Sequence, residues 1–250
     1  MPNYCVFYSY LQTKKSKNNL NFFIKNGLSL NDDIFYVFLI NNHKYSSVIP
    51  NQKNIKIICR DNIGHDFGSW KHGLDTINRK FDYYIFMNDT VLGPFLPRYI
   101  PKNISWYSMF CNLISKKKKL SGLTINYFPW GNKNNDLQHV QSMMFCTDNI
   151  GLEILKKSIF NINPIDYETI YNNSRKNFII RFEIGMSKEI IKNGFEISAL
   201  YFCDILNIKT NDVWINNIYY DTTINPLETM FIKKNRIDSK IINFYSNTLK

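Results

Sequence analysis

RDNIGHDFGSWKHGLDTINRKFDYYIFMNDTVLGP, from Arg60 to Pro94, is the stretch that decides the fold. A polar loop with glycines leads into a helical pattern, and the apolar run Tyr83 to Met87 follows. This run ends at Asn88-Asp89-Thr90, shortly before a Gly-Pro pair. A carboxylate at the carboxyl end of a central strand lies where α/β sheets bind their ligands. Asp89 is therefore placed to hold a divalent metal against phosphate oxygens.

Strands and helices alternate through the first half of the chain. Continuous apolar runs predict strands that are covered on both faces, and apolar residues three or four apart predict helices. Alternation of the two indicates βαβ units and a parallel sheet, hence an α/β fold. The expected strands are 5–11, 34–40, 55–59 and 83–87, and the expected helices are 17–28 and 67–77.

The second half is less regular. Residues 106–114 suit either a strand or a helix, and the charge run Lys116 to Lys119 is most simply a solvated turn. A helix expected at 183–193 stops at Gly194, a residue suited to the position after a helix. The other expected elements are strands at 122–128, 139–146 and 195–202 and a helix at 150–158. With no repeat and no linker, we expect a single domain over residues 1–250.

The composition of the chain limits the classes of partner that it can bind. The chain of 250 residues is 44% hydrophobic and 16% aromatic, which excludes global disorder. A net charge of +11 favours anionic partners such as nucleic acid, a membrane surface or a phosphorylated substrate. The alternative is that lysine only fills the surface. No apolar run is long enough to span a membrane. The amino-terminal residues do not resemble a signal peptide.

Cysteine usage points to a reducing compartment. The five cysteines are Cys5, Cys59, Cys111, Cys146 and Cys203, and no two form a CxxC pair. Zinc and redox sites are therefore weakly supported. An odd number of thiols, most of them within apolar stretches, suits a cytoplasmic protein. We expect a soluble protein in the cytoplasm, or in the host cytoplasm if the chain is viral.

Two blocks carry a family resemblance. Residues 62–74 (NxGxDFGSWKxGL) and 81–94 (FDYYIFMNDTVLGP) resemble the rhamnan-synthesis-F type glycosyltransferases and their viral relatives. The similarity continues in order through HVQSMMF at 139–145, EIGMSKEIIKNGFEISAL at 183–200 and NPLETMFIKKNRI at 225–237. It implies the GT-A fold, a Rossmann-like α/β architecture with a mostly parallel central sheet flanked by helices. It also implies transfer of rhamnose or another hexose from a UDP- or dTDP-sugar to a glycan or glycoprotein acceptor.

The resemblance also assigns roles along the chain. It implies that residues 1–100 bind the nucleotide sugar and that residues 101–250 bind the acceptor. Asp89 would ligate Mn²⁺ or Mg²⁺, although the GT-A motif has two carboxylates and this chain has Asn88-Asp89-Thr90. The implied donor contacts are Tyr8, Arg60, Asn62, Gly64, Asp66, Lys71, Asn88, Asp89 and Thr90.

Glu183 is the implied general base. It opens a segment that resembles the acidic motif of inverting GT-A enzymes, where a carboxylate deprotonates the acceptor hydroxyl. Asp136, before the HVQS block, is the second candidate. His139 and Gln141 flank Val140 on an expected strand, so both face the same side and are candidates to contact the sugar or the acceptor.

Each of these residues also has a purely structural interpretation. Asp89 can cap a turn, Asp66 can be the N-cap of the following helix, and Glu183 can be a first-turn helix acid. Arg60 can be a strand-end charge, and a lone histidine such as His139 can lie in the core. The alternative function is a catalytically inactive basic module that binds anionic glycan or nucleic acid. A nucleotidyltransferase is a further possibility, but it usually needs paired carboxylates.

Overall fold

A computed structural model describes residues 1–45, 47–127, 138–201, 214–215, 218–219, 224–233, 237 and 239–248. Its centre is an eight-stranded sheet in the order β3-β2-β1-β4-β8-β6-β7, with β9 beside β6. These strands are β1 (Tyr4–Leu11), β2 (Ile34–Asn41), β3 (Ile55–Arg60), β4 (Tyr83–Asn88), β6 (Lys118–Tyr127), β7 (Gln138–Val140), β8 (Met144–Asp148) and β9 (Glu196–Tyr201).

The first four strands of the sheet run parallel. β1 lies between β2 and β4, and β3 continues the sheet beyond β2. β8 and β6 then run antiparallel to their neighbours, and β9 is parallel to β6. The expected α/β architecture with a mostly parallel central sheet is confirmed, and the six elements expected before residue 90 are all present.

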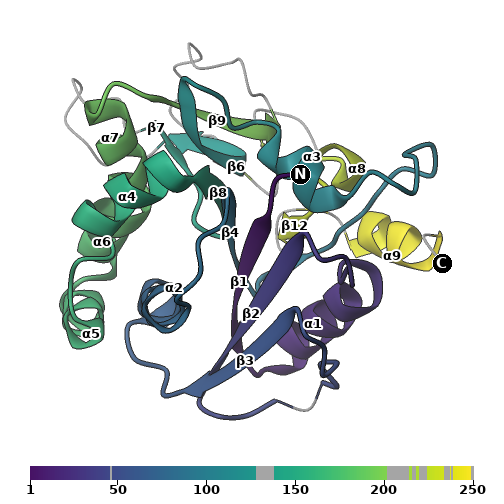
Figure 1. The fold of residues 1–250 in the computed structure, drawn as a ribbon, viewed down its shortest axis with the longest axis horizontal. Helices are drawn as coiled ribbons and strands as arrows, with labels where there is room; N and C mark the ends of the chain where they lie inside the picture. Colours follow the sequence, from purple (N-terminus) through teal and green to yellow (C-terminus); the bar gives the residue numbers. More distant parts are fainter. Residues whose placement is uncertain are drawn as a thin grey trace.

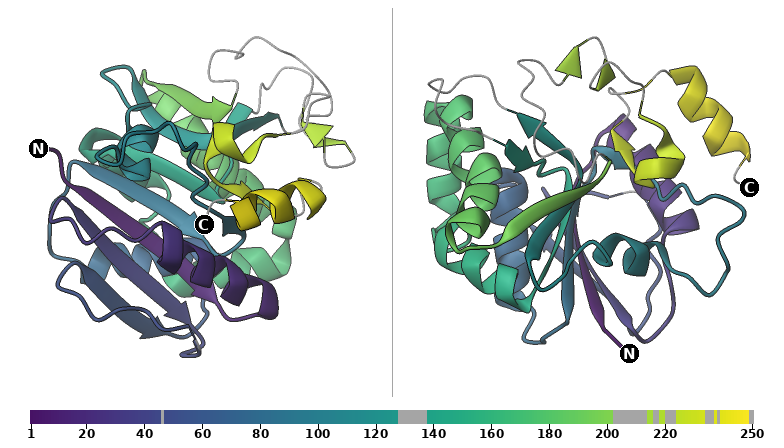
Figure 2. Two further views of the ribbon diagram at one scale, coloured as in Figure 1. Left: turned by 90° about the vertical axis from the view of Figure 1, so that its right-hand side faces the viewer. Right: turned by 90° about the horizontal axis from the view of Figure 1, so that it is seen from above.

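Helices cover both faces of this sheet (Figures 1 and 2). One face carries α1 (Lys14–Asn26) and α3 (Trp106–Cys111). The other carries α2 (His65–Thr76), α4 (Asn149–Ser158), α5 (Pro164–Asn173), α6 (Arg175–Phe178), the π-helical turn η1 (Ile179–Ile184) and α7 (Gly185–Lys192). Residues 106–114, left open by the sequence, therefore begin as a helix.

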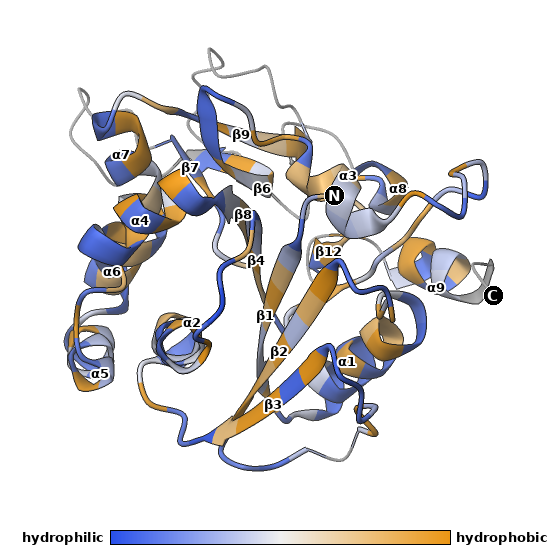
Figure 3. Ribbon diagram, in the orientation of Figure 1, coloured by the Kyte–Doolittle hydropathy of each residue, from blue (hydrophilic) through white to orange (hydrophobic). Residues whose placement is uncertain are grey.

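Alternation along β1 divides the core into two layers. Tyr8 packs in the cluster that contains Phe23 of α1, whereas Phe7 packs in the cluster that contains Trp70 of α2. Trp70 is fully buried, and burying a large apolar side chain contributes roughly 1.5–3 kcal/mol. β2, buried along most of its length, is coloured mainly as hydrophobic in Figure 3. The continuous apolar runs thus reflect strands with helices on both sides.

The carboxyl-terminal segment forms small pairings outside the central sheet. It comprises the short hairpin β10 (Trp214–Ile215) and β11 (Ile218–Tyr219), then α8 (Pro226–Thr229), β12 (Ile232–Lys233) and α9 (Ser239–Thr248). β12 pairs antiparallel with β5 (Val91–Leu92), which follows β4 almost directly. This pairing brings residues near the end of the chain next to the Asn88-Asp89-Thr90 turn.

Three expectations for the second half are wrong in detail. The strand expected at 139–146 is broken between β7 and β8, because β6 pairs with each of them separately. Lys119 is not in a solvated turn: it lies in β6, 4% exposed, with its amine 2.5 Å from Asp148. Glu183 does not begin a helix, because η1 continues from α6 into α7.

Candidate functional site

A chain of hydrogen bonds runs along the carboxyl ends of the parallel strands. Arg60 Nη1 at the end of β3 donates to Asn41 Oδ1 at the end of β2 over 2.6 Å. Asn41 Nδ2 in turn lies 3.3 Å from Ser9 Oγ on β1, and Ser9 donates to Asp66 Oδ1 over 2.9 Å. Strand register places these short polar side chains at one edge, the expected position of a ligand site.

Asp66 is the meeting point of this network. Asn88 Nδ2, at the end of β4, donates to Asp66 Oδ2 over 2.8 Å. Asn88 Oδ1 accepts from the backbone N–H and the hydroxyl of Thr90, at 3.1 and 2.6 Å. Burial raises the pKa of Asp66, and the bonds from Ser9 and Asn88 oppose that rise. Gly64 occupies the N-cap of α2, so Asp66 is not the helix cap.

A cavity of about 270 Å³ opens beside Asp66. It lies between α2, the end of β4, the helices α5 and α6, η1 and β12. Acidic, basic and aromatic side chains therefore face the same space, as in sites that bind polar organic ligands. The lining residues are His65, Asp66, Phe67, Asn88, Thr90, Ser142, Tyr171, Arg175, Phe178, Ile179, Glu183 and Lys233.

Glu183 reaches the cavity from the π-helical turn. Ser142 Oγ donates to its Oε2, and His139 Nε2 lies 3.6 Å from its Oε1. Burial tends to raise the pKa of Glu183, but His139, Ser142 and the charge of Lys233 together hold it below its ordinary value. The carboxylate is therefore ionised at neutral pH, as a proton acceptor must be. π-Helical turns often occur at functional sites.

Asp89 lies beside this cavity but does not line it. Its Oδ2 accepts the backbone N–H of Leu11 over 2.6 Å, and its carbonyl oxygen accepts Asn19 Nδ2 from α1 over 2.8 Å. Burial raises its pKa to about 7, and the nearby charge of Asp66 adds to the rise. The carboxylate thus lacks a compensating cation among the described residues.

The described residues fit a divalent metal only with help from a substrate. Both oxygens of Asp66 accept hydrogen bonds, and so does Oδ2 of Asp89. In the part of the chain that the structure describes, no three His, Cys, Asp or Glu side chains gather into a metal site. Asp89 Oδ1 is left for a cation, and Mg²⁺ commonly binds through one or two carboxylates plus substrate phosphates.

Comparison with known proteins decides the family. The family model described as rhamnan synthesis protein F matches residues 40–246. The chain belongs to the rhamnan synthesis protein F family. It is 26% identical over 194 residues to virulence protein VirA of Vibrio anguillarum (strain ATCC 68554 / 775), a match that covers 70% of this chain. The match covers 55% of the relative, so the chain spans about half of its length.

Two solved structures of the glycosyltransferase GlyE of Streptococcus pneumoniae TIGR4 are also similar. One is 10% identical with a TM-score of 0.42 and covers 81% of this chain and 46% of that one. The other, the apo form, is 9% identical with a TM-score of 0.41 and covers 78% of this chain and 44% of that one.

Four of the predicted site residues of this family member come together in the cavity. Asp66, Asn88 and Thr90 meet Glu183 there. Three of them come from residues 1–100 and Glu183 from residues 101–250, and the division of the chain into a donor and an acceptor half stays a prediction. Asp136 lies outside the described residues, so its role as the second candidate base also stays a prediction.

Three predicted donor contacts have structural partners instead. Tyr8 is 1% exposed and packs on Phe23 and Phe38, so its ring is not available to stack on a base. Arg60 is buried and donates to Asn41 and to the carbonyl of Ile63, which fixes the loop before α2. Lys71 pairs with Asp75 over 2.6 Å, one turn further along α2, and does not line the cavity.

The glycines of the loop approach protein and not a ligand. Gly64 has φ +75°, and its N–H donates to Glu168 of α5 over 2.9 Å. A Cβ on Gly68 would stand 2.4 Å from the carbonyl oxygen of Ile63. The N–H of Asn62 bonds Asn42 Oδ1 over 3.2 Å. The N–H groups of Gly64 and Asn62, two of the implied donor contacts, are therefore used within the protein.

The predicted pair His139 and Gln141 is also buried. His139 is 1% exposed and faces Glu183, whereas Gln141 is 7% exposed and accepts from Thr124 over 2.8 Å. Gln141 follows β7 and does not line the cavity. Neither side chain is therefore placed for the sugar or acceptor contact expected from the sequence.

Sequence reasoning missed eight of the residues that line the cavity, among them Lys233, Ser142, Tyr171 and Arg175. Lys233 lies in a block that the resemblance covers, but only the pairing of β12 with β5 shows where it points. Ser142 also lies in a noted block, HVQSMMF. Tyr171 and Arg175 come from a helical region for which the sequence predicted no element. The missed signal was the helix start at Asn163-Pro164, with Asp166 completing a capping box.

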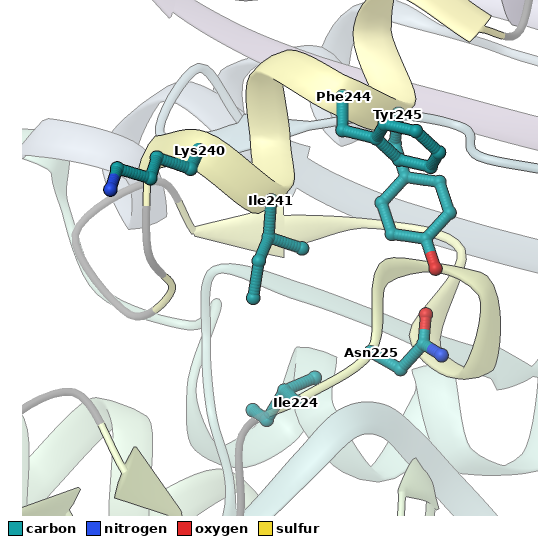
Figure 4. Close-up of a pocket in the computed structure, with 6 residues that line it drawn as sticks. All are labelled: Ile224, Asn225, Lys240, Ile241, Phe244 and Tyr245. Atoms are coloured by element: carbon teal, nitrogen blue, oxygen red, sulfur yellow. The ribbon is translucent and has the colours of Figure 1, made fainter.

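A second cavity, of about 480 Å³, lies between α9 and the segment before α8. Figure 4 shows the Tyr245 hydroxyl directed towards Asn225, while Lys240 extends away. Its lining is mainly apolar and holds no carboxylate among the described residues. Among the helices described, none has the length and apolar character needed to cross a membrane.

Proposed function

We propose that this chain is a glycosyltransferase domain that moves a sugar, rhamnose or another hexose, from a UDP- or dTDP-sugar to a glycan acceptor. Membership of the rhamnan synthesis protein F family supports sugar transfer. The observation that carries the proposal is that Asp66 and Glu183, two carboxylates in opposite electrostatic environments, face one cavity. Groups whose pKa values are pushed apart commonly mark the division of roles in an active site.

The chemistry of the cavity suits a sugar. Carboxylates such as Asp66 and Glu183 accept hydrogen bonds from hydroxyl groups. The rings of Tyr171 and Phe178 line the same space and offer apolar faces to the C–H side of a pyranose. Arg175 and Lys233 add positive charge. A volume of about 270 Å³ is near the lower limit for small-molecule pockets, which matches a single sugar unit better than a whole nucleotide sugar.

The proposed reaction is a substitution at the anomeric carbon. The acceptor oxygen forms a bond to that carbon while the bond to the diphosphate oxygen breaks. Glu183 accepts the proton of the acceptor hydroxyl, and the nucleoside diphosphate leaves with the bonding electron pair. Lys233 and Arg175 stabilise the charge that develops on the diphosphate. This scheme is the inverting one; in a retaining enzyme Glu183 would position the acceptor instead.

A divalent metal is part of the proposal. Asp89 Oδ1 would hold it together with phosphate oxygens of the donor, and the ion would supply Lewis-acid stabilisation of the leaving group. The raised pKa of Asp89 supports this assignment, because a cation there would remove the penalty of ionising a buried carboxyl.

Ligand-induced thermal stabilisation tests the donor. UDP- and dTDP-sugars would be compared with and without Mn²⁺, and one donor class is expected to raise the melting temperature in a metal-dependent way. A ligand at a hundred times its Kd stabilises the folded state by about 2.7 kcal/mol. Asp89→Asn keeps an acceptor for the Leu11 N–H but removes the charge, so the metal-dependent part of the shift should disappear.

The outcomes of this experiment distinguish a glycosyltransferase from a basic binding module. If Asp89→Asn responds to donor and Mn²⁺ like the unmodified protein, the metal assignment fails. If no nucleotide sugar stabilises the protein, but a sulfated glycan or an oligonucleotide does, the chain is a basic binding module and the proposed transfer activity is wrong.

A further inference from the structure

The carboxylate of Glu183 is held from two sides. The bond from Ser142 reaches Oε2, and His139 stands 3.6 Å from Oε1. Ser142 lies in the turn between β7 and β8, and His139 lies on β7, so the two groups come from one short segment. A carboxylate with a partner at each oxygen has little rotational freedom. The same oxygen lone pair therefore stays directed towards the cavity.

The backbone around this arrangement is also fixed. The N–H of Val140, next to His139, donates to Ser187 Oγ over 2.9 Å. Ser187 is fully buried on α7, the helix that continues from Glu183 through η1. One segment therefore contacts the helix both at the carboxylate and one turn later. This double contact sets the distance between β7 and η1.

His139 has no access to a ligand. It is 1% exposed and is absent from the cavity lining, whereas Ser142 and Glu183 both line it. A buried imidazole next to a carboxylate acts on that carboxylate through charge and hydrogen bonding. Its function must therefore be exerted through Glu183 and not on the substrate.

Other charged groups face Glu183 from the remaining elements. Lys233 of β12 favours the ionised carboxylate, but His139 and Ser142 act more strongly. Arg175 of α6, Tyr171 of α5, and His65 and Asp66 of α2 line the same cavity. His65 lies 3.8 Å from Glu168, a carboxylate of α5. Within the described chain, the histidine paired with Glu183 is His139.

We propose that His139 is a positioning residue for Glu183, which fixes the orientation of the carboxylate and sets the pH above which it accepts a proton from the acceptor. This inference rests on the proposed function, because it takes Glu183 as the base. It assigns to His139 a role that differs from the sugar or acceptor contact expected from the sequence.

The first test is the pH profile of transfer. In His139→Phe, loss of the imidazole beside Oε1 should raise the pKa of Glu183, so the acidic limb of the kcat profile moves to higher pH. A shift of about one pH unit is expected for a partner at this distance. His139→Gln retains a donor near the position of Nε2 and should restore part of the shift. KM for the donor should stay the same.

The matched control is His43→Gln, because His43 is exposed and pairs with Asp61, away from the cavity. Its pH profile should equal that of the unmodified protein. An acidic limb that is identical in His139→Phe, His43→Gln and the unmodified protein overturns the proposal. A fall in kcat without a displaced limb would indicate that His139 only supports packing, and this result also overturns it.

A second measurement does not depend on activity. Carboxyl ¹³C signals of labelled glutamate would be titrated, and Glu183 would be assigned by its disappearance in Glu183→Gln. The Glu183 midpoint should rise in His139→Phe and not in His43→Gln. If no donor is ever transferred but this midpoint rises, the proposed function fails while the coupling of His139 to Glu183 stands. An unchanged midpoint refutes the coupling.

Discussion

Three carboxylates at or beside the cavity have different surroundings. Burial raises the pKa of Asp66 and that of Asp89, whereas the partners of Glu183 lower its pKa. Asp66 and Asp89 accept hydrogen bonds from neutral donors only, whereas Glu183 has the imidazole of His139 beside Oε1 in addition to the hydroxyl of Ser142 at Oε2. Carboxylates that lie at or beside one cavity can therefore hold different protonation states at one pH.

Glu183→Gln should lower the transfer rate at least about 10²-fold and leave donor affinity nearly unchanged. It should also change stability in a pH-dependent way. The folded pKa of Glu183 lies below its ordinary value, so ionised Glu183 adds stability above pH 4.5 that is lost as the pH falls through the folded pKa. The variant should thus be less stable than the unmodified protein at pH 7, and the difference should narrow in acid.

Rate measurements at saturating donor and thermal melts between pH 3 and 8 check both parts. If Glu183→Gln transfers sugar at nearly the original rate, the carboxylate is structural, and Asp136 or a retaining mechanism becomes the better explanation. A stability difference that stays constant with pH would contradict the lowered pKa.

The position of a site residue was predictable where it depends only on the end of a strand or helix. Asp66, Asn88 and Thr90 stand at strand or helix ends, and sequence alone placed them at one edge. The partners of Arg60 and Tyr8 were not predictable, because they depend on neighbouring strands and on α1. A polar or aromatic residue near a strand end looks the same in the sequence whether it faces a ligand or the core.

At the scale of elements, α2 is held against the loop before it by a close backbone contact. Gly68 packs on the carbonyl of Ile63, which also accepts Arg60 Nη2 over 2.6 Å. Gly68→Ala would gain about 1 kcal/mol of helix propensity. The added Cβ would stand 2.4 Å from that carbonyl oxygen, and overpacking of this kind costs about 1–3 kcal/mol. We expect net destabilisation, measured by urea denaturation.

Ser69→Ala is the matched control on the same helix. Ser69 is fully buried, and its hydroxyl has no hydrogen-bond partner among the described residues. Removing it should leave stability unchanged or slightly higher. If Gly68→Ala is as stable as Ser69→Ala, the loop can shift away from α2, and the contact does not fix it.

Element positions followed from periodicity, but their irregularities did not. Apolar runs and helical spacing predicted β1 to β4 and α2 closely. The helix expected at 183–193 begins inside the π-helical turn η1, which the sequence did not predict. One extra residue in a turn rotates the following side chains by about 100°, but it leaves no mark in the composition. The break between β7 and β8 depends on pairing with β6, which no local pattern encodes.

At the scale of the whole molecule, the cavity is closed by segments far apart in the sequence. Antiparallel pairing of β12 with β5 places Lys233 opposite Val91, beside the turn that contains Asp89. The charge of Lys233 then favours the ionised form of both carboxyl groups: it opposes the rise in the pKa of Asp66 and adds to the lowering of the pKa of Glu183. A basic residue near the carboxyl end thus acts on carboxylates from both halves of the chain, and sequence reasoning missed it because the pairing is non-local.

The lysines that contribute to the net charge of +11 differ in their surroundings. In the run Lys116 to Lys119, Lys116 and Lys117 are exposed, but Lys119 is buried and paired with Asp148, the N-cap of α4. Lys119→Met would leave the half-buried carboxylate of Asp148 without its partner and should destabilise the protein, by up to about 3 kcal/mol.

Lys117→Met is the control, because an exposed lysine contributes little to folding stability. Urea denaturation of both variants tests the difference, and equal midpoints would show that the pair with Asp148 contributes nothing.

Changing Lys116 and Lys117 to Ser should weaken attachment to anionic vesicles by about 1 kcal/mol for each residue near the surface. Turnover on a small soluble acceptor should stay the same, because neither side chain lines the cavity. A large loss of turnover would instead place this run in the active site.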